Sequence, residues 1–148
     1  MLSAVLKGYY LHNEIREKGG AYGGMCSYNA TDGVFQMVSY RDPHIKRTRD
    51  VYEGIFEFLK SGLAGQEEVN QLIVTTFGGL DNPGSPAGNA AADFYEQLED
   101  VAHEMKQSFR DGIFNCKYDD LLSTAEKYLK RHSSVVVVTS EEILKKKK

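Results

Sequence analysis

Residues 11–24 have the sequence LHNEIREKGGAYGG, and this stretch decides the local fold. A helix is expected to end within it, because the Gly19-Gly20 pair stops a helix readily. An aromatic and β-branched segment begins at Tyr22, which is typical of a strand. Such a helix, turn and strand can direct Arg16 and Tyr22 into one cleft.

The residue types alone leave the role of this pair open. An arginine in the last turn of a helix commonly does no more than complement the helix dipole. A tyrosine in a strand is commonly half in the core and half at the surface. On composition alone, structural roles for Arg16 and Tyr22 are therefore the favoured interpretation.

Outward from this stretch, hydrophobic periodicity predicts a helix over residues 3–17. The apolar positions of its core face are Ala4, Gly8, Leu11 and Ile15, widened by Val5, Leu6 and Tyr9. A β-hairpin is expected to follow, with strands over residues 22–29 and 34–40 and turn residues Thr31-Asp32-Gly33 between them.

Periodicity and composition predict the rest of the elements. Helices are expected over residues 45–61, 66–77, 89–98, 100–114 and 118–131, with a glycine- and proline-rich loop over 78–88. Four consecutive valines predict a buried strand over residues 133–139, and a short last helix over 140–144 is a further expectation. The fold class is therefore α+β, a mostly antiparallel sheet packed with helices.

Three strands are few for this much helix, so the sheet is expected to be incomplete at its N-terminal side. Residues 1–148 then form a single partial domain of a larger protein, and residues 141–148 form a flexible basic tail. An uncovered strand edge or helix face predicts self-association of the chain.

Composition excludes several classes of function. The 148 residues are 41% hydrophobic and 26% charged, with a formal net charge of -3, so nucleic-acid binding has no electrostatic support. No apolar run is long enough to cross a membrane. The two cysteines, Cys26 and Cys116, are far apart in sequence, which favours buried free thiols in a reducing compartment.

The chain carries no catalytic apparatus of its own in the sequence. Its four histidines form neither H-E-x-x-H nor the inverted H-x-x-E-H motif. Cys26 and Cys116 form no Cys-x-x-Cys pair, and no serine lies in a G-x-S-x-G context. We therefore expect no zinc site built by this chain alone.

The run over residues 11–24 resembles the C-terminal half of the pitrilysin/insulysin metallopeptidases, the inverzincins, and is most similar to the presequence protease and falcilysin-like subfamily. The further matches are Ser39-Tyr40-Arg41-Asp42-Pro43, Asp81-x-Pro83-x-x-Pro86, Lys106-x-x-x-Arg110, Asp120-Leu121-Leu122 and Tyr128-Leu129. The resemblance covers most of residues 2–139. Its two specific parts are the Lys-Gly-Gly-Ala-Tyr-Gly run and the Ser-Tyr-Arg-Asp-Pro run.

The resemblance implies a part of a zinc metalloendopeptidase that degrades unstructured peptides between two closing halves. The N-terminal half of such an enzyme carries the zinc and its glutamate base, so this chain alone is predicted to be inactive. By position in the motif, Arg16 and Tyr22 bind the substrate backbone, and Tyr22 also has a catalytic role as donor to the developing oxyanion. A mitochondrial or other organellar location is a further implication.

An alternative function remains open at this point. Related subunits of respiratory complexes are non-catalytic, so the chain can also belong to a scaffold or assembly subunit that has lost its zinc motif. The presence of both Arg16 and Tyr22 in the expected context favours the enzyme, because a scaffold has no use for that pair.

Overall fold

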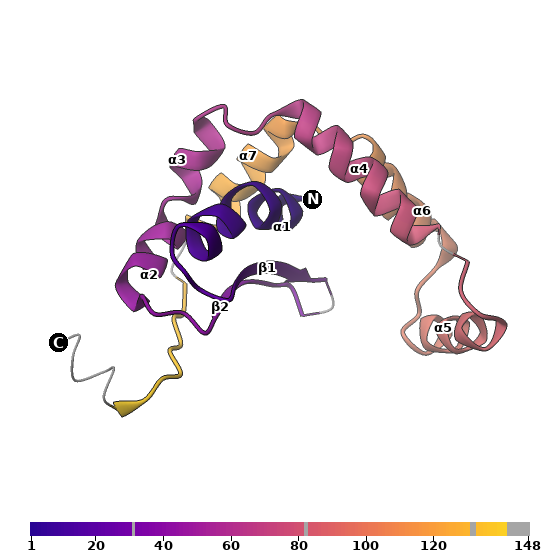
Figure 1. The fold of residues 1–148 in the computed structure, drawn as a ribbon. Helices are drawn as coiled ribbons and strands as arrows, with labels where there is room; N and C mark the ends of the chain where they lie inside the picture. The colour runs from indigo at the N-terminus through magenta and orange to yellow at the C-terminus, as the bar shows by residue number, and fades with distance from the viewer. Residues whose placement is uncertain (31, 82, 131–132, 142–148) are drawn as a thin grey trace.

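The computed structural model describes residues 1–30, 32–81, 83–130 and 133–141, and has the predicted α+β fold class. A two-stranded antiparallel sheet lies beside the first helices, and an arm of longer helices extends away from it (Figure 1). The elements in chain order are α1 (Leu2–Val5), the π-helix η1 (Leu6–Glu17), β1 (Gly23–Asn29), β2 (Val34–Tyr40), α2 (Ile45–Glu53), α3 (Ile55–Lys60), α4 (Gln66–Leu80), α5 (Pro86–Leu98), α6 (His103–Phe114) and α7 (Tyr118–Tyr128).

The first helix was predicted correctly in extent but not in winding. After α1 the chain continues as a π-helix, whose hydrogen bonds join residues five apart. This winding buries Leu6, Leu11 and Ile15 and leaves Gly8 exposed. The predicted core face was therefore wrong at Gly8 and Tyr9, both of which are exposed, because it assumed the spacing of an α-helix.

The hairpin is confirmed at the predicted strands. Gly23 pairs with Tyr40, Met25 with Val38 and Asn29 with Val34. At the turn, Gly33 has a φ of +65°, a left-handed conformation that glycine adopts without strain. One face of the hairpin packs on η1, while the other presents exposed apolar side chains, namely Met25, Val34, Val38 and Tyr40.

The core lies where η1, the inner face of the hairpin, α3, α7 and the first turns of α4 meet. Its largest fully buried side chains are Leu6, Leu11, Ile15, Leu59, Val5 and Val69. Burial of one such side chain stabilises a fold by about 1.5–3 kcal/mol, so this cluster holds the turn at residues 18–22 in place.

Two predicted helix boundaries were wrong. The helix expected over residues 45–61 is divided into α2 and α3 at Gly54, where the hydroxyl of Tyr10 leaves no room for a side chain. The loop expected over residues 78–88 is much shorter, because α4 continues to Leu80 and α5 begins at Pro86. Ser85 caps α5 by accepting a hydrogen bond from the amide of Gly88 at 3.1 Å.

The buried strand predicted over residues 133–139 is also wrong. This segment has no regular secondary structure, and Val136 and Val138 are 86% and 95% exposed. A run of β-branched residues forms a strand only when it pairs with a neighbouring strand, and the sheet of the described residues contains β1 and β2 alone. The short helix expected over 140–144 and the tail at 141–148 lie almost wholly outside the described residues.

Helices α4 and α6 lie side by side and carry α5 at their far end (Figure 1). Phe77 and Phe114 pack edge to face with their ring centroids 6.1 Å apart, and Arg110 forms an ion pair with Asp81. No described residue of α5 is buried. The arm therefore holds together through contacts between α4 and α6.

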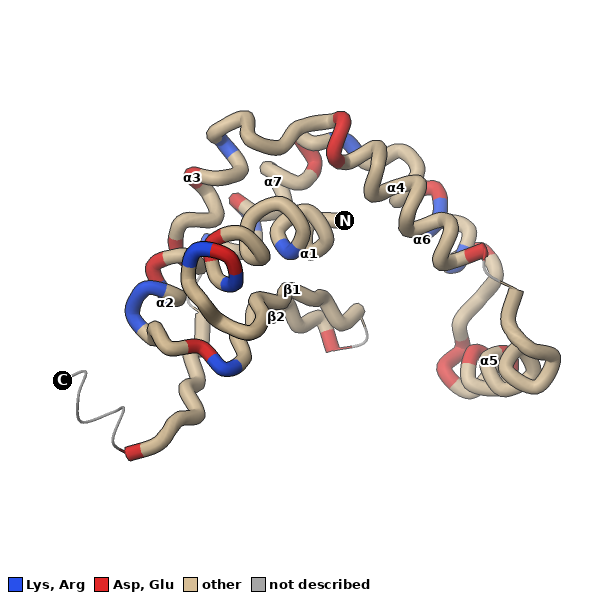
Figure 2. The backbone as a smooth tube through the Cα atoms, viewed as in Figure 1, with Lys and Arg blue, Asp and Glu red and all other residues tan. Residues whose placement is uncertain are grey.

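Helices η1, α2, α3, α6 and α7 carry charged residues of both signs, whereas α4 and α5 carry only acidic ones (Figure 2). Among the described residues, no helix combines the length and apolar character needed to cross a bilayer.

Candidate functional site

The turn after η1 ties the positions of Arg16 and Tyr22 together through the backbone. The amide of Ala21 donates to the carbonyl oxygen of Ile15 at 3.1 Å, and the amide of Gly20 donates to that of Arg16 at 2.9 Å. Gly20 has a φ of +71°, a left-handed backbone conformation that would cost free energy in a residue with a side chain. The residues just before Arg16 and just before Tyr22 are therefore hydrogen-bonded to one another.

Arg16 lies in the last turn of η1 with its side chain 55% exposed. Its only described ion pair is a long one, with Nε 3.9 Å from the Glu17 carboxylate. A surface pair at this distance contributes little, so the guanidinium is accessible to a ligand.

Tyr22 joins the turn to the hairpin. Its amide donates to the carbonyl oxygen of Tyr40 at 3.1 Å, which extends the strand pairing by one residue. Its ring stands at 87° to the ring of Tyr40, with the centroids 5.9 Å apart. The side chain is 67% exposed, and no described residue hydrogen-bonds to its hydroxyl.

Sequence reasoning missed a third member of this cluster. The guanidinium carbon of Arg41 lies 5.8 Å from the ring centroid of Tyr22 and 5.5 Å from that of Tyr40. Arg41 belongs to the Ser39–Pro43 run that supported the resemblance, but the residue types of that run did not predict a contact with Tyr22.

Asp42 fixes the backbone just after Arg41. Its carboxylate accepts hydrogen bonds from the amide of His44 at 2.8 Å and from the hydroxyl of Thr48. Burial raises the pKa of the Asp42 carboxyl, but its hydrogen bonds with Thr48 and the His44 amide outweigh burial. The pKa of Asp42 therefore lies below its usual value, and the carboxylate stays charged.

The two cysteines lie apart, as free thiols. Cys26 is buried under η1, and burial raises the pKa of its thiol to about 12. Cys116 is half-buried, and burial raises its pKa as well. Both thiols are thus held in the neutral form, which is not the state of a nucleophile.

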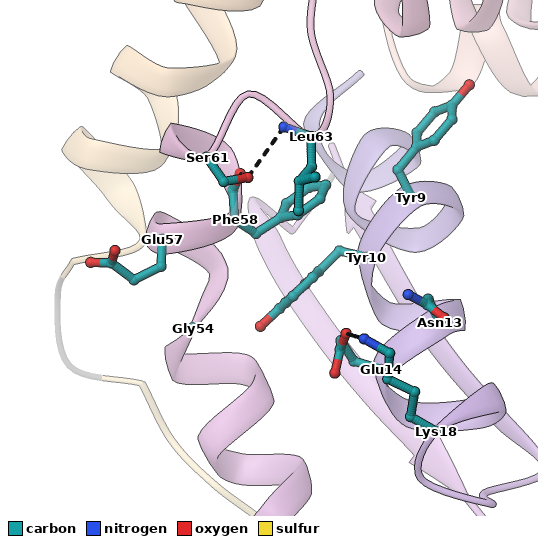
Figure 3. A pocket seen from close by; sticks show the side chains of 10 residues that line it. All are labelled: Tyr9, Tyr10, Asn13, Glu14, Lys18, Gly54, Glu57, Phe58, Ser61 and Leu63. Carbon is teal, nitrogen blue, oxygen red and sulfur yellow. Dashed lines mark hydrogen bonds and ion pairs between the residues drawn. The ribbon is translucent and has the colours of Figure 1, made fainter.

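A separate hollow of about 550 Å³ lies between η1 and α3 (Figure 3). Tyr10 crosses it, stacked on Phe58 at 4.7 Å, and its hydroxyl donates to the carbonyl oxygen of Val51 at 2.9 Å. The remaining lining residues are Tyr9, Asn13, Glu14, Lys18, Gly54, Glu57, Ser61 and Leu63. Neither Arg16 nor Tyr22 lines it, so the hollow is not the predicted site.

A family model, described as the PreP C-terminal domain, matches residues 1–141. The chain belongs to this family. The membership predicted from residues 11–24 is thereby confirmed for nearly the whole length.

Relatives of this PreP C-terminal domain include the mitochondrial presequence proteases of three organisms. The Kluyveromyces lactis protein is 38% identical over 97% of this chain, and the Schizosaccharomyces pombe protein is 34% identical over 97%. The Mus musculus protein is 35% identical over 87% of this chain. This chain covers only 14%, 15% and 12% of the length of these three proteins, respectively.

Proposed function

We propose that this chain is the substrate-binding part of a longer protease that degrades unstructured peptides. The support is its similarity to mitochondrial presequence proteases, of which it covers 12% to 15%. The partners in this proposal are peptide substrates and the N-terminal half of the same enzyme. A mitochondrial location is part of the same proposal and rests on the names of the relatives.

The described residues do not form a site that could bind the zinc of such a protease. Among them, no three His, Cys, Asp or Glu side chains are grouped so that they can hold a metal ion. We therefore place the metal ligands on another part of the enzyme and expect no peptide hydrolysis from this chain alone.

Tyr22 is assigned the catalytic role in this chain. Its phenol is exposed, and no described residue engages the hydroxyl, so the hydroxyl proton is available to a substrate oxygen. A peptide carbonyl oxygen gains negative charge when its carbon is attacked. A donor already directed at that oxygen lowers the barrier more than it lowers the free energy of the bound substrate.

Arg16 is assigned to binding of the peptide backbone. Its guanidinium presents several N–H donors in a planar fork, which suits carbonyl oxygens of an extended peptide. The weak ion pair with Glu17 leaves these donors accessible. The hydrogen bonds of the turn fix the position of the Arg16 backbone relative to that of Tyr22.

The observation that carries this proposal is the exposed, unengaged Tyr22 hydroxyl, and Tyr22→Phe in the full-length protease tests it. Removal of one oxyanion donor typically lowers kcat by roughly 10²–10³. Cleavage of an unstructured peptide should be measured beside thermal unfolding. Tyr28→Phe is the matched control, because Tyr28 is also exposed on this hairpin and the described hydrogen bonds do not include its hydroxyl.

Wild-type kcat in a well-folded Tyr22→Phe enzyme would contradict the catalytic role. Parallel loss of activity and melting temperature would instead indicate a structural role. A scaffold or assembly subunit, the alternative function, predicts that the wild-type full-length protein cleaves no peptide at all.

A further inference from the structure

Arg41 has a backbone conformation that is unusual for its residue type. Its φ is +49°, and Asp100 is the only other non-glycine residue with a positive φ in the described part of the chain. A long side chain in this left-handed region costs free energy, and the conformation persists only where its surroundings determine it.

Hydrogen bonds on both sides determine this conformation. Before Arg41, the carbonyl oxygen of Tyr40 accepts the amide of Tyr22 at 3.1 Å. After it, the Asp42 carboxylate binds the amide of His44 and the hydroxyl of Thr48, and Thr48 is buried at the start of α2. The strand and the helix thus hold the intervening residue in a strained turn.

The strained turn brings the guanidinium over two aromatic rings. The Arg41 guanidinium carbon is within 6 Å of the centroids of both Tyr22 and Tyr40, the distance at which a cation is attracted to a ring face. The described ion pairs do not include Arg41. Its charge is therefore directed to the rings rather than to a carboxylate.

The ring of Tyr22 has few other restraints. It is 67% exposed, and its described ring contacts are the edge-to-face contact with Tyr40 and the Arg41 cation. A mobile phenol is a poor donor for a transition state, because its hydroxyl must be ordered at each turnover.

We propose that Arg41 is a positioning residue of the peptidase site, which holds the Tyr22 ring against Tyr40 so that the hydroxyl is ordered before the peptide arrives. This inference rests on the proposed catalytic role of Tyr22 and extends it to a residue on the neighbouring strand end. Arg41 acts through Tyr22 and does not itself contact the peptide.

The test uses the full-length protease with Arg41→Gln and Arg41→Lys, each alone and combined with Tyr22→Phe. Glutamine keeps a polar side chain and the strain of the backbone, but it is shorter than arginine and carries no cation. We expect Arg41→Gln to lower kcat about two- to fivefold, the range of an exposed cation–π contact, with KM and melting temperature unchanged. Arg41→Lys should retain most of the rate, because an ammonium is also attracted to a ring face.

The double variant separates positioning from direct contact. If Arg41 acts through the Tyr22 hydroxyl, Arg41→Gln should cause no further loss of kcat in the Tyr22→Phe background. An equal loss in both backgrounds would overturn the proposal, because Arg41 would then act on the peptide without Tyr22. Wild-type kcat in Arg41→Gln, where Tyr22→Phe does lower kcat, would overturn it as well.

A spectroscopic measurement keeps this proposal distinct from the catalytic role of Tyr22. In protease labelled with fluorotyrosine, the ¹⁹F signal that disappears in Tyr22→Phe belongs to Tyr22. Arg41→Gln should shift this signal and leave that of Tyr28 in place. An unshifted signal would overturn the positioning contact. A shifted signal together with wild-type turnover in Tyr22→Phe would support the contact and refute the catalytic role alone.

Discussion

Gly24 lies directly against Ile15, and a methyl group at residue 24 would come within 2.9 Å of the Ile15 Cβ. The same methyl group would lie 3.0 Å from the carbonyl oxygen of Leu11, which is backbone and cannot move aside. The hairpin therefore packs against η1 with no room for a side chain at residue 24. This contact sets the separation between the helix that carries Arg16 and the strands that hold Tyr22.

Gly24→Ala should lower the free energy of unfolding by about 1–3 kcal/mol, the usual cost of overpacking a well-packed site. Gly23→Ala is the matched control, because a methyl group there would meet nothing within 4 Å. Urea denaturation followed by circular dichroism compares the two variants. Equal stability of both would show that the strand can move away from Ile15.

Arg16→Ala in the full-length protease should raise KM, because the guanidinium binds the peptide in its ground state. Arg16→Lys should restore little of the affinity, since an ammonium cannot reproduce the fork. Lys7→Ala removes an exposed cation from the same helix and serves as the control. An unchanged KM in a folded Arg16→Ala enzyme would remove Arg16 from the substrate site.

Alkylation should distinguish the two thiols. At pH 8 the Cys26 thiol, with a pKa of about 12 in place of 9.0, has a roughly 10³-fold smaller thiolate fraction than an ordinary cysteine. Iodoacetamide should therefore modify the half-buried Cys116 first and Cys26 only after unfolding. Peptide mapping by mass spectrometry reads both sites, and rapid labelling of Cys26 in the native protein would contradict its burial.

The same pKa shift predicts a loss of stability in alkali. The folded-state pKa of Cys26 lies above its unfolded value, so its contribution is complete below pH 9 and declines as the pH rises towards 12. Burial also raises the pKa of Tyr10, Tyr52 and Tyr118, and ionisation of these phenols lowers the free energy of unfolding in alkali as well. The urea midpoint should therefore fall as the pH rises above 9, and less steeply in Cys26→Ala.

The isolated 148-residue chain is expected to self-associate through the hairpin. The opening helix is an unsuitable contact, because Leu2, Val5 and Leu6 are buried, whereas the outer face at Val38 is exposed. Val38→Lys should lower the association measured by sedimentation velocity, and Val74→Lys on α4 should not. A monomer over a wide range of concentration would contradict this expectation.

Local signals in the sequence were sufficient for the hairpin and for the extent of most helices. They failed where the outcome depends on partners or on winding. The valines at 135–138 have high strand propensity, but propensity supplies no edge to pair with. The π winding of η1 moved Gly8 out of the core, although its residue types fit an α-helix equally well.

The site was predictable only in part. Arg16 and Tyr22 were found through the motif around Gly19-Gly20, and the described geometry leaves both side chains accessible. Arg41 was not found, because its contact with Tyr22 depends on a left-handed backbone between a strand and a capped helix. No spacing in the sequence encodes that turn.

The arm of α4 and α6 has a mechanical consequence. Near its base, Val69 is fully buried in the core, while no described residue of α5 at its far end is buried. A helix of this length spans roughly 22 Å, so a tilt of about 10° at the base carries its far end through about 4 Å. A small repacking around Val69 would therefore move α5 much further than it moves the base of the arm.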